Sequence, residues 1–223
     1  MIGRVIALIP AYNEAARVGD VVAEARRHVD EVVVIDDGSN DGTAAAAEKA
    51  GARILRHEKN RGKGGAITTA LDYFGRSDAE FAILLDADGQ HDPSEITKFL
   101  EAARREQADI VVGNRMGDTE EMPVVRRLTN EFTSWVTSKL ARQRIPDSQC
   151  GYRLLRRSVL KDLRLSTARF ETETEMLIQA ARAGHRIVDI SIRTIYESDH
   201  ASHVHPVRDT IRFFTFVRKY WKA

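Results

Sequence analysis

Residues 81–88 read Phe-Ala-Ile-Leu-Leu-Asp-Ala-Asp, a short apolar run that ends in two carboxylates one residue apart. A run of this length, followed by turn residues, is typical of a buried strand. In an open parallel sheet, ligands bind just beyond the carboxyl ends of the strands. Asp86 and Asp88 therefore stand where two hard oxygen ligands could hold a divalent cation together with the phosphates of a nucleotide.

Strand and helix signals alternate on both sides of this segment. Apolar runs predict strands at residues 5–9, 31–35, 52–55, 81–85 and 110–112. Helical periodicity, with start and stop signals, predicts helices at residues 14–28, 43–51, 65–74 and 92–105. Repeated units of this kind predict an α/β fold with a parallel sheet and helices on both faces.

The pattern changes near residue 115. Residues 116–123 are polar, and we expect them to form a loop. Beyond this loop, the patterns predict helices at residues 124–141, 171–183 and 206–222, and short strands at residues 152–155 and 187–192. No repeat, low-complexity segment or linker interrupts the sequence, so we expect residues 1–223 to form a single domain.

The composition is that of a globular protein with a sizeable core, since 43% of the 223 residues are hydrophobic and 30% are charged. A formal net charge of +1 gives no electrostatic reason to expect nucleic acid as a partner. The single cysteine, Cys150, excludes an intramolecular disulfide and suits a reducing compartment. We find no signal-peptide pattern and no apolar stretch near the ~18–20 residues of a membrane span. We expect a cytoplasmic protein, which could lie peripherally on the inner face of the cell membrane.

Acidic residues follow three of the expected strands: Glu14, the pair Asp36 and Asp37, and the pair Asp86 and Asp88. Carboxylates in these places can bind a ribose hydroxyl or a metal ion. A lone Asp-x-Asp triplet is more often a solvated turn or a helix cap. Its position after a buried strand, together with the two further acidic clusters, favours a ligand-binding role here.

The glycine-rich stretch Gly62-Lys63-Gly64-Gly65 has two interpretations. It is either a tight turn with a lysine at the start of a helix, or a loop that contacts phosphate. It is neither a P-loop nor a dinucleotide-binding fingerprint, because the required spacing is absent.

Five short motifs are spread over the first 115 residues. They are Ile-Pro-Ala-Tyr-Asn-Glu at 9–14, Val-Ile-Asp-Asp-Gly-Ser at 34–39, Asn-Arg-Gly-Lys-Gly at 60–64, Asp-Ala-Asp-Gly-Gln-His at 86–91 and Gly-Asn-Arg at 113–115. Together they resemble the family 2 glycosyltransferases, and in particular the dolichol- and polyprenyl-phosphate mannosyl and glucosyl synthases. The resemblance implies a GT-A fold, in which a Rossmann-like, mostly parallel sheet is flanked by helices and joined to a smaller acceptor-side region.

The resemblance also implies a nucleoside-diphosphate sugar as donor, Mg²⁺ or Mn²⁺ as cofactor, and inversion at the anomeric carbon. Residues 1–115 would be the nucleotide-sugar-binding half, and residues 116–223 the acceptor-binding half. The metal ligands would be Asp86, Asp88 and Gln90. With the other strand-end residues and the glycine-rich turn, the expected nucleotide-binding set is Pro10, Ala11, Tyr12, Glu14, Asp36, Asp37, Lys63, Asp86, Ala87 and Asp88.

The acceptor decides whether the reaction needs a base. A hydroxyl acceptor needs a general base, whereas a lipid phosphate is already ionised at neutral pH and needs cations to hold it. By resemblance, Arg115 and Arg127 contact the acceptor phosphate, and arginine suits forked hydrogen bonds with phosphate. Asp147 is the candidate base for a hydroxyl acceptor, or it caps a turn after Pro146. The expected catalytic residues are therefore Asp88, Arg115, Arg127 and Asp147.

The last expected helix, residues 206–222, is amphipathic and basic, with aromatic side chains on its apolar side. Such a helix can lie in the headgroup region of a membrane, or it can dock on its own domain or on a partner. His203 and His205, in the loop that precedes this helix, could approach the donor diphosphate.

The expected function is transfer of one hexose from GDP-mannose or UDP-glucose to an acceptor, with a polyprenyl or dolichyl phosphate favoured. The sequence leaves the donor base, the sugar and the oligomeric state open. Two alternatives remain: a glycosyltransferase that uses a hydroxyl acceptor, and a protein that binds a nucleotide sugar without turnover. Sugar-phosphate nucleotidyltransferases are disfavoured, because residues 10–14 lack the glycine-rich basic loop that usually follows their first strand.

Overall fold

The structure is a computed structural model that describes residues 3–117, 122, 124–167, 169, 171–195, 213, 215–218 and 220–221. Within these residues the strands are β1 (Val5–Ala11), β2 (Glu31–Asp36), β3 (Arg53–Arg56), β4 (Phe81–Leu84), β5 (Ile110–Asn114), β6 (Arg153–Arg156) and β7 (Ile187–Ser191). The α-helices are α1 (Val18–Ala25), α2 (Thr43–Lys49), α3 (Lys63–Arg76), α4 (Ile96–Arg105), α5 (Val124–Ala141) and α6 (Glu171–Arg182). Two 3₁₀ segments are η1 (Pro93–Glu95) and η2 (Arg157–Asp162).

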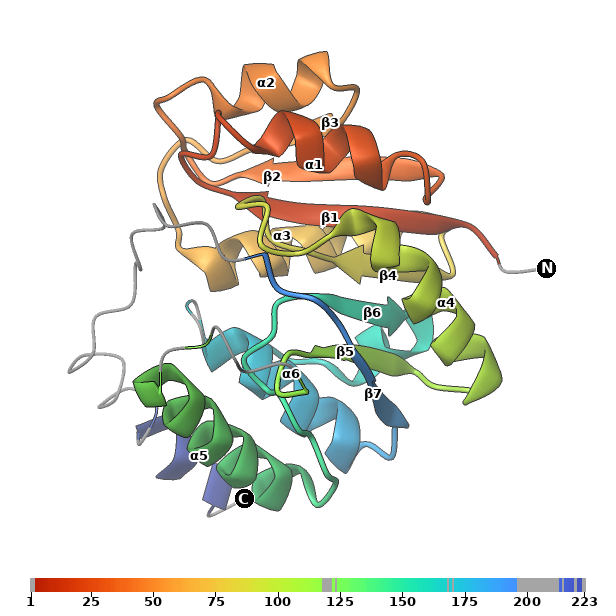
Figure 1. Cartoon of the computed structure of the whole chain (residues 1–223), viewed down its shortest axis with the longest axis vertical. Coiled ribbons are helices and arrows are strands. Elements are labelled where there is room, and N and C mark those ends of the chain that lie inside the picture. Colours follow the sequence, from red (N-terminus) through yellow and green to blue (C-terminus); the bar gives the residue numbers. More distant parts are fainter. Residues whose placement is uncertain are drawn as a thin grey trace.

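The strands form one sheet in the order β3-β2-β1-β4-β6-β5-β7 (Figure 1). β6 runs antiparallel to both of its neighbours, β4 and β5, and the other pairs are parallel. The expected α/β fold with a mostly parallel sheet is therefore confirmed. Because β6 lies between β4 and β5, the two halves of the sequence contribute to the same sheet.

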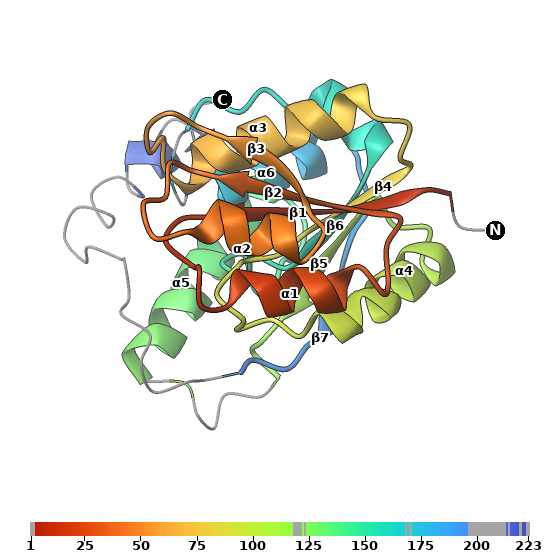
Figure 2. The same cartoon turned by 90° about the horizontal axis from the view of Figure 1, so that it is seen from above.

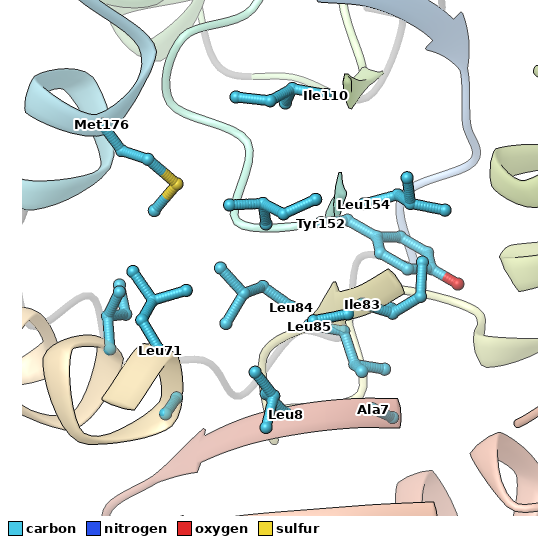
Figure 3. Packing of buried hydrophobic residues seen from close by; sticks show 14 of the residues in the cluster. Ala7, Leu8, Leu71, Ile83, Leu84, Leu85, Ile110, Tyr152, Leu154 and Met176 are labelled. Carbon is cyan, nitrogen blue, oxygen red and sulfur yellow. The ribbon is translucent and has the colours of Figure 1, made fainter. Parts of the chain in front are cut away.

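Helices cover both faces of the sheet. α3 and α6 lie over one face, whereas α1 and α4 lie over the other (Figures 1 and 2). On the first face, Leu71 of α3 and Met176 of α6 point toward Leu8 and Leu84 of the central strands (Figure 3). All four side chains are buried, so this contact excludes water from the middle of the domain.

The first helix is shorter than its periodicity predicts. Residues 14–28 were expected to be helical, but α1 begins only at Val18. The backbone N–H of Glu14 donates to Thr43 Oγ1, and that of Ala15 donates to Asp41. These contacts hold the start of the segment against the loop before α2, and residues 15–17 form a turn that leads into the helix, with the N–H groups of Arg17 and Val18 donating to Glu14 O. Of the helix expected at residues 206–222, most lies outside the described residues.

The register of the central strands brings the strand-end residues to one edge of the sheet. Ala11 of β1 lies opposite Asp36 of β2. β6 is antiparallel to β4, and its Arg153 lies opposite Leu84. Two residues further along this register, Gly151 faces Asp86. The sheet therefore gathers the carboxyl ends of β1, β2 and β4 and the amino end of β6 at one place.

Candidate functional site

Asp86 forms an ion pair with Lys63 at the edge of the sheet. The Nζ atom of Lys63, at the start of α3, lies 2.8 Å from Asp86 Oδ1 and 3.0 Å from Asp86 Oδ2. The same Nζ atom lies 3.4 Å from Glu173 Oε2, in the first turn of α6. One ammonium group therefore lies between two carboxylates that come from different parts of the chain. Of these two residues, Glu173 is buried.

Both members of this pair are charged at neutral pH. Burial by itself would lower the pKa of Lys63, but the charges of Asp86 and Glu173 raise it above its ordinary value. Burial would also raise the pKa of Asp86, but Lys63, and more weakly His91 and Arg115, bring it below the ordinary value. The Asp86 carboxylate thus sits in a place that attracts a cation.

Gly151 is required beside Asp86 because the two chains approach each other closely. A Cβ atom built on Gly151 would lie 2.5 Å from Asp86 Oδ2, well inside van der Waals contact. The antiparallel register of β6 and β4 produces this approach. Any larger residue at position 151 would displace the carboxylate that faces Lys63.

Asp88 and Gln90 form the turn that follows. The backbone N–H of Gln90 donates to Asp88 Oδ1 at 3.0 Å, which fixes the orientation of the Asp88 carboxylate. His91, directly after Gln90, is buried, and its ring lies 5.3 Å from the ring of Tyr152. Burial lowers the pKa of His91 despite the nearby charges of Asp86 and Asp88.

Asp37 holds the glycine-rich turn in place. Its Oδ1 accepts the backbone N–H of Arg61, and its Oδ2 accepts the backbone N–H of Gly62, both at 2.8 Å. His57 Nδ1 lies 2.7 Å from Asp37 Oδ1. Because Lys63 begins α3 directly after this turn, Asp37 indirectly positions the lysine against Asp86. The turn interpretation of the glycine-rich stretch describes its geometry in this structure.

The other residues expected at the nucleotide lie around the end of β1. Asp36, fully buried, accepts the backbone N–H of Ser39, and its Oδ2 lies 3.2 Å from Arg56 Nε. Ala11 is buried, whereas the aromatic ring of Tyr12 is exposed at the rim. Of the remaining members of the set, Pro10 and Glu14 are half-buried and Ala87 is buried.

Arg115 and Asp147 form a buried, forked ion pair. Arg115 Nε lies 2.8 Å from Asp147 Oδ2, and Arg115 Nη2 lies 3.0 Å from Asp147 Oδ1. The backbone N–H of Arg115 also donates to Asp147 Oδ2. Burial alone would raise the pKa of Asp147, but the hydrogen bonds and charge of Arg115 bring it below its ordinary value. Asp147 is therefore an anion whose oxygens already accept hydrogen bonds, which makes it a weak candidate for a general base.

Arg127 is paired within its own helix. Its Nε atom lies 3.7 Å from Glu131 Oε1, one turn further along α5, and the two side chains are about half-exposed, at 44% and 53%. His203 and His205 lie outside the described residues, so the expected approach of either histidine to the donor stays a prediction.

A metal could be held at this site by only a few protein oxygens. Among the residues that the structure describes, no group of three or more His, Cys, Asp or Glu side chains is placed to bind a metal ion. Asp86 and Asp88 alone would supply the carboxylates. Mg²⁺ is commonly bound by one or two carboxylates, with water and substrate phosphates completing the coordination. Asp86 already binds one cation in this structure, the Lys63 ammonium group. The surroundings of this carboxylate therefore suit a positive charge.

Three residues around this site were given no role from the sequence: His57, Gly151 and Arg153. His57 follows β3, and its N–H donates to Asp36 O, so the parallel pairing of β2 and β3 would have placed it beside Asp37. Arg153 is fully buried and donates to the carbonyl oxygens of Cys150, Ser148 and Glu173. No local pattern predicts the contact of Gly151 with Asp86 or that of Arg153 with Glu173, since these partners come from distant elements.

A family model described as "Glycosyl transferase family 2" matches residues 6–164 of the chain. The chain belongs to this family. The resemblance that the five motifs carry is therefore confirmed, and the protein is a glycosyltransferase enzyme. No helix among its described residues is long and apolar enough to cross a membrane.

Two of the curated relatives to which this glycosyltransferase is similar are named for lipid-phosphate acceptors. The UDP-N-acetylglucosamine–dolichyl-phosphate N-acetylglucosaminyltransferase of Methanococcus voltae is 32% identical over 212 residues, covering 85% of this chain and 84% of that protein. An undecaprenyl-phosphate mannosyltransferase of Micrococcus luteus is 30% identical over 202 residues, covering 85% of this chain and 82% of that protein.

Solved structures of other glycosyltransferases confirm the GT-A fold. Mannosyl-3-phosphoglycerate synthase from Rubrobacter xylanophilus matches with a TM-score of 0.73 at 20% identity, over 99% of this chain and 73% of that chain. Glucosyl-3-phosphoglycerate synthase from Mycobacterium tuberculosis, in complex with Mn²⁺, UDP-glucose and glycerol 3-phosphate, matches with a TM-score of 0.69 at 18% identity, over 98% of this chain and 79% of that chain.

Proposed function

We propose that this glycosyltransferase moves one sugar from a nucleoside diphosphate to a polyprenyl or dolichyl phosphate, with inversion at the anomeric carbon. The observation that carries the proposal is a buried arginine, Arg115, which Asp147 holds in a forked ion pair. Four residues after Asp147, Gly151 lies against Asp86, since a Cβ atom built on it would be 2.5 Å from Asp86 Oδ2. One short segment therefore contacts both the cation for an acceptor phosphate and a carboxylate of the donor side. The names of the relatives from Methanococcus voltae and Micrococcus luteus support the same acceptor class.

On the donor side, the loop after β1 and the strand-end aspartates form the proposed nucleotide site. Asp86 and Asp88 would hold Mg²⁺ or Mn²⁺, with Gln90 as a further oxygen ligand. A divalent ion bound there would neutralise the charge that develops on the leaving diphosphate. Lys63, held by Asp86 and Glu173, places an additional positive charge next to the same phosphates.

On the acceptor side, a phosphate oxygen is the proposed nucleophile. It is ionised at neutral pH, so the reaction needs no general base. Arg115 presents a guanidinium of fixed orientation, which suits phosphate recognition. Arg127, exposed on α5 and 3.7 Å from Glu131, is the second cation that we assign to this phosphate. The lowered pKa of Asp147 argues against the alternative in which it deprotonates a hydroxyl acceptor. A membrane-embedded acceptor would bring the enzyme to the cytoplasmic face of the membrane.

A ligand screen tests the donor side. A nucleoside diphosphate at about 100 times its Kd stabilises the folded state by about 2.7 kcal/mol, which raises the thermal midpoint by about 5–11 °C for a chain of this size. We expect such a shift for UDP or GDP in the presence of Mn²⁺, and a much smaller shift in Asp88→Asn. A wild-type midpoint that no nucleoside diphosphate moves would contradict the proposed donor site.

A further inference from the structure

His57 is a buried histidine that joins three parts of the donor side. It follows β3 directly, and its backbone N–H donates to Asp36 O at 2.9 Å, which continues the parallel pairing of β2 and β3. Its ring Nδ1 lies 2.7 Å from Asp37 Oδ1, and its ring Nε2 lies 2.9 Å from Thr69 Oγ1 in α3. His57 therefore connects the ends of two strands to the helix that begins with Lys63.

The Asp37 carboxylate is shared between His57 and the glycine-rich turn. Besides the contact with His57, its two oxygens accept the backbone N–H groups of Arg61 and Gly62. Asp37 is only 3% exposed, so these hydrogen bonds replace water around a buried carboxylate. Two of its three partners belong to the turn itself, and His57 is the partner that ties the carboxylate to the rest of the fold.

The turn has few contacts of its own that could fix it. Gly62 has a φ of +81°, and its side of α3 has no side-chain cap. Within the turn, Asn60 Oδ1 also accepts the Gly62 N–H, at 3.0 Å. Glycine has the widest conformational freedom of any residue, so a turn rich in glycine depends on acceptors outside it for a single conformation. Asp37 supplies such acceptors.

The position of the turn decides the position of Lys63. Lys63 begins α3 directly after the turn, and its Nζ atom lies 2.8 Å from Asp86 Oδ1 and 3.4 Å from Glu173 Oε2. The attraction between two charges weakens with their separation, so a shift of about 1 Å at the start of α3 would weaken these contacts. A chain of contacts thus runs from His57 through Asp37 and the turn to the ammonium group.

We propose that His57 is a positioning residue of the donor site, which acts through Asp37 to fix the glycine-rich turn and, with it, Lys63. The consequence for donor binding rests on the proposed function, in which Lys63 lies next to the leaving diphosphate. The consequence for the turn does not depend on any ligand. His57 itself would not contact the donor, because its two ring nitrogens face Asp37 and Thr69.

Three variants separate this role from a purely structural one. His57→Asn keeps an N–H donor in the place of Nδ1 and loses the contact with Thr69, whereas His57→Leu loses both contacts. His185→Leu is the matched control. The His185 side chain is 10% exposed, and its Nδ1 lies 3.4 Å from Asp109 Oδ2. Its Nε2 lies 2.8 Å from Asp162 Oδ2, and it precedes β7, at the edge of the sheet where the parallel strands begin. All three variants are expected to lower the thermal midpoint.

Amide hydrogen exchange at Arg61 and Gly62, measured by NMR without nucleotide, tests the turn directly. We expect these two amides to exchange at least about tenfold faster in His57→Leu than in the wild type. In His57→Asn and His185→Leu, their rates should stay within about threefold of the wild type. Unchanged rates in His57→Leu would overturn the proposal, and so would an equal increase in His185→Leu.

Calorimetric titration with UDP and with GDP, each in the presence of Mn²⁺, tests the donor site. For the nucleotide that the wild type binds, the Kd should rise at least about tenfold in His57→Leu and less than about threefold in His57→Asn and His185→Leu. A Kd that is unchanged in His57→Leu, or raised equally in His57→Asn, would overturn the proposal.

Two further provisions keep the outcomes distinct. His57→Gln, whose longer side chain carries its amide toward Thr69 rather than Asp37, takes the place of His57→Leu in both measurements if that variant does not fold. If the wild type binds neither UDP nor GDP, the donor side of the proposed function fails. The exchange rates of Arg61 and Gly62 then decide by themselves whether His57 positions the turn.

Discussion

Replacing Asp147 with asparagine removes the negative charge that faces Arg115 but keeps the shape of the side chain. Asp147 is fully buried and Arg115 is 5% exposed, so water cannot replace the lost charge. Asparagine also turns an NH₂ group, which is a donor, toward a guanidinium whose N–H groups are all donors as well. Removing one partner of a buried ion pair costs about 3–5 kcal/mol of folding free energy. For a chain of this size, we expect the thermal midpoint of Asp147→Asn to fall by about 6–20 °C.

The pH dependence of this difference follows from the lowered pKa of Asp147. A carboxyl whose folded pKa lies below its unfolded value of about 3.9 stabilises the protein fully above that pH. The stabilisation is lost as the pH falls through the folded pKa, because the carboxylate then takes up a proton. The difference in unfolding free energy between wild type and Asp147→Asn should therefore be constant near neutral pH and shrink below about pH 4.

Urea denaturation at several pH values measures both effects. Glu131→Gln is the matched control, because the Arg127–Glu131 pair is exposed and its atoms are 3.7 Å apart. An exposed pair contributes at most about 1 kcal/mol. The reasoning is refuted if Asp147→Asn is no less stable than Glu131→Gln, or if its stability deficit grows on acidification.

Three other predictions concern the surroundings of Asp86 and the only cysteine. Lys63→Met leaves Asp86 and Glu173 without their shared cation. It should lower the thermal midpoint, and added Mn²⁺ should raise that midpoint more in the variant than in the wild type; equal Mn²⁺ shifts would contradict this. Gly151→Ala would place Cβ 2.5 Å from Asp86 Oδ2, so transfer activity should fall by more than about tenfold. Gly184→Ala is the control, because Gly184 has a φ of +87° but no atom lies within 4 Å of its Cβ position. This variant should keep its activity despite a small loss of stability. Similar activities in the two variants would count against the close approach of residue 151 to Asp86. Burial raises the pKa of the Cys150 thiol to about 12. Ellman's reagent at pH 8 should therefore react with this thiol only after the protein unfolds. Rapid labelling of the folded protein would contradict this prediction, because it would show that Cys150 is accessible.

The strands and the edge of the sheet were predictable because they depend on local patterns. The run that precedes Asp86, residues 81–85, is apolar throughout. This pattern alone predicts a buried strand with Asp86 at its carboxyl end. The predicted bounds of the first helix, 14–28, were wrong, because α1 spans only Val18–Ala25. At its start, Thr43 and Asp41 accept the backbone N–H groups of Glu14 and Ala15 and hold this segment in a turn. These acceptors lie about 25–30 residues away along the chain, where no local pattern reports them.

The partners of the site residues were less predictable than the residues themselves. Arg115 and Asp147 were both identified, but with separate roles, and their 32-residue separation hid the ion pair between them. Lys63 was expected either to start a helix or to contact phosphate. The structure places it at the start of α3, where it forms ion pairs with Asp86 and Glu173, and its contact with phosphate stays a prediction. Such contacts depend on how α3, β4 and α6 pack, and packing is fixed only by the complete fold.

A transfer assay with two matched acceptors tests the central claim most directly. The purified enzyme is given Mn²⁺, each of several labelled nucleotide sugars, and either a polyprenyl phosphate or the corresponding polyprenol, and the lipid products are identified by mass spectrometry. We expect one donor to yield a glycosyl polyprenyl phosphate in the wild type, little product in Asp88→Asn, and no product from the polyprenol. Sugar transferred to the polyprenol as readily as to its phosphate, or a product that persists undiminished in Asp88→Asn, would contradict the proposed chemistry.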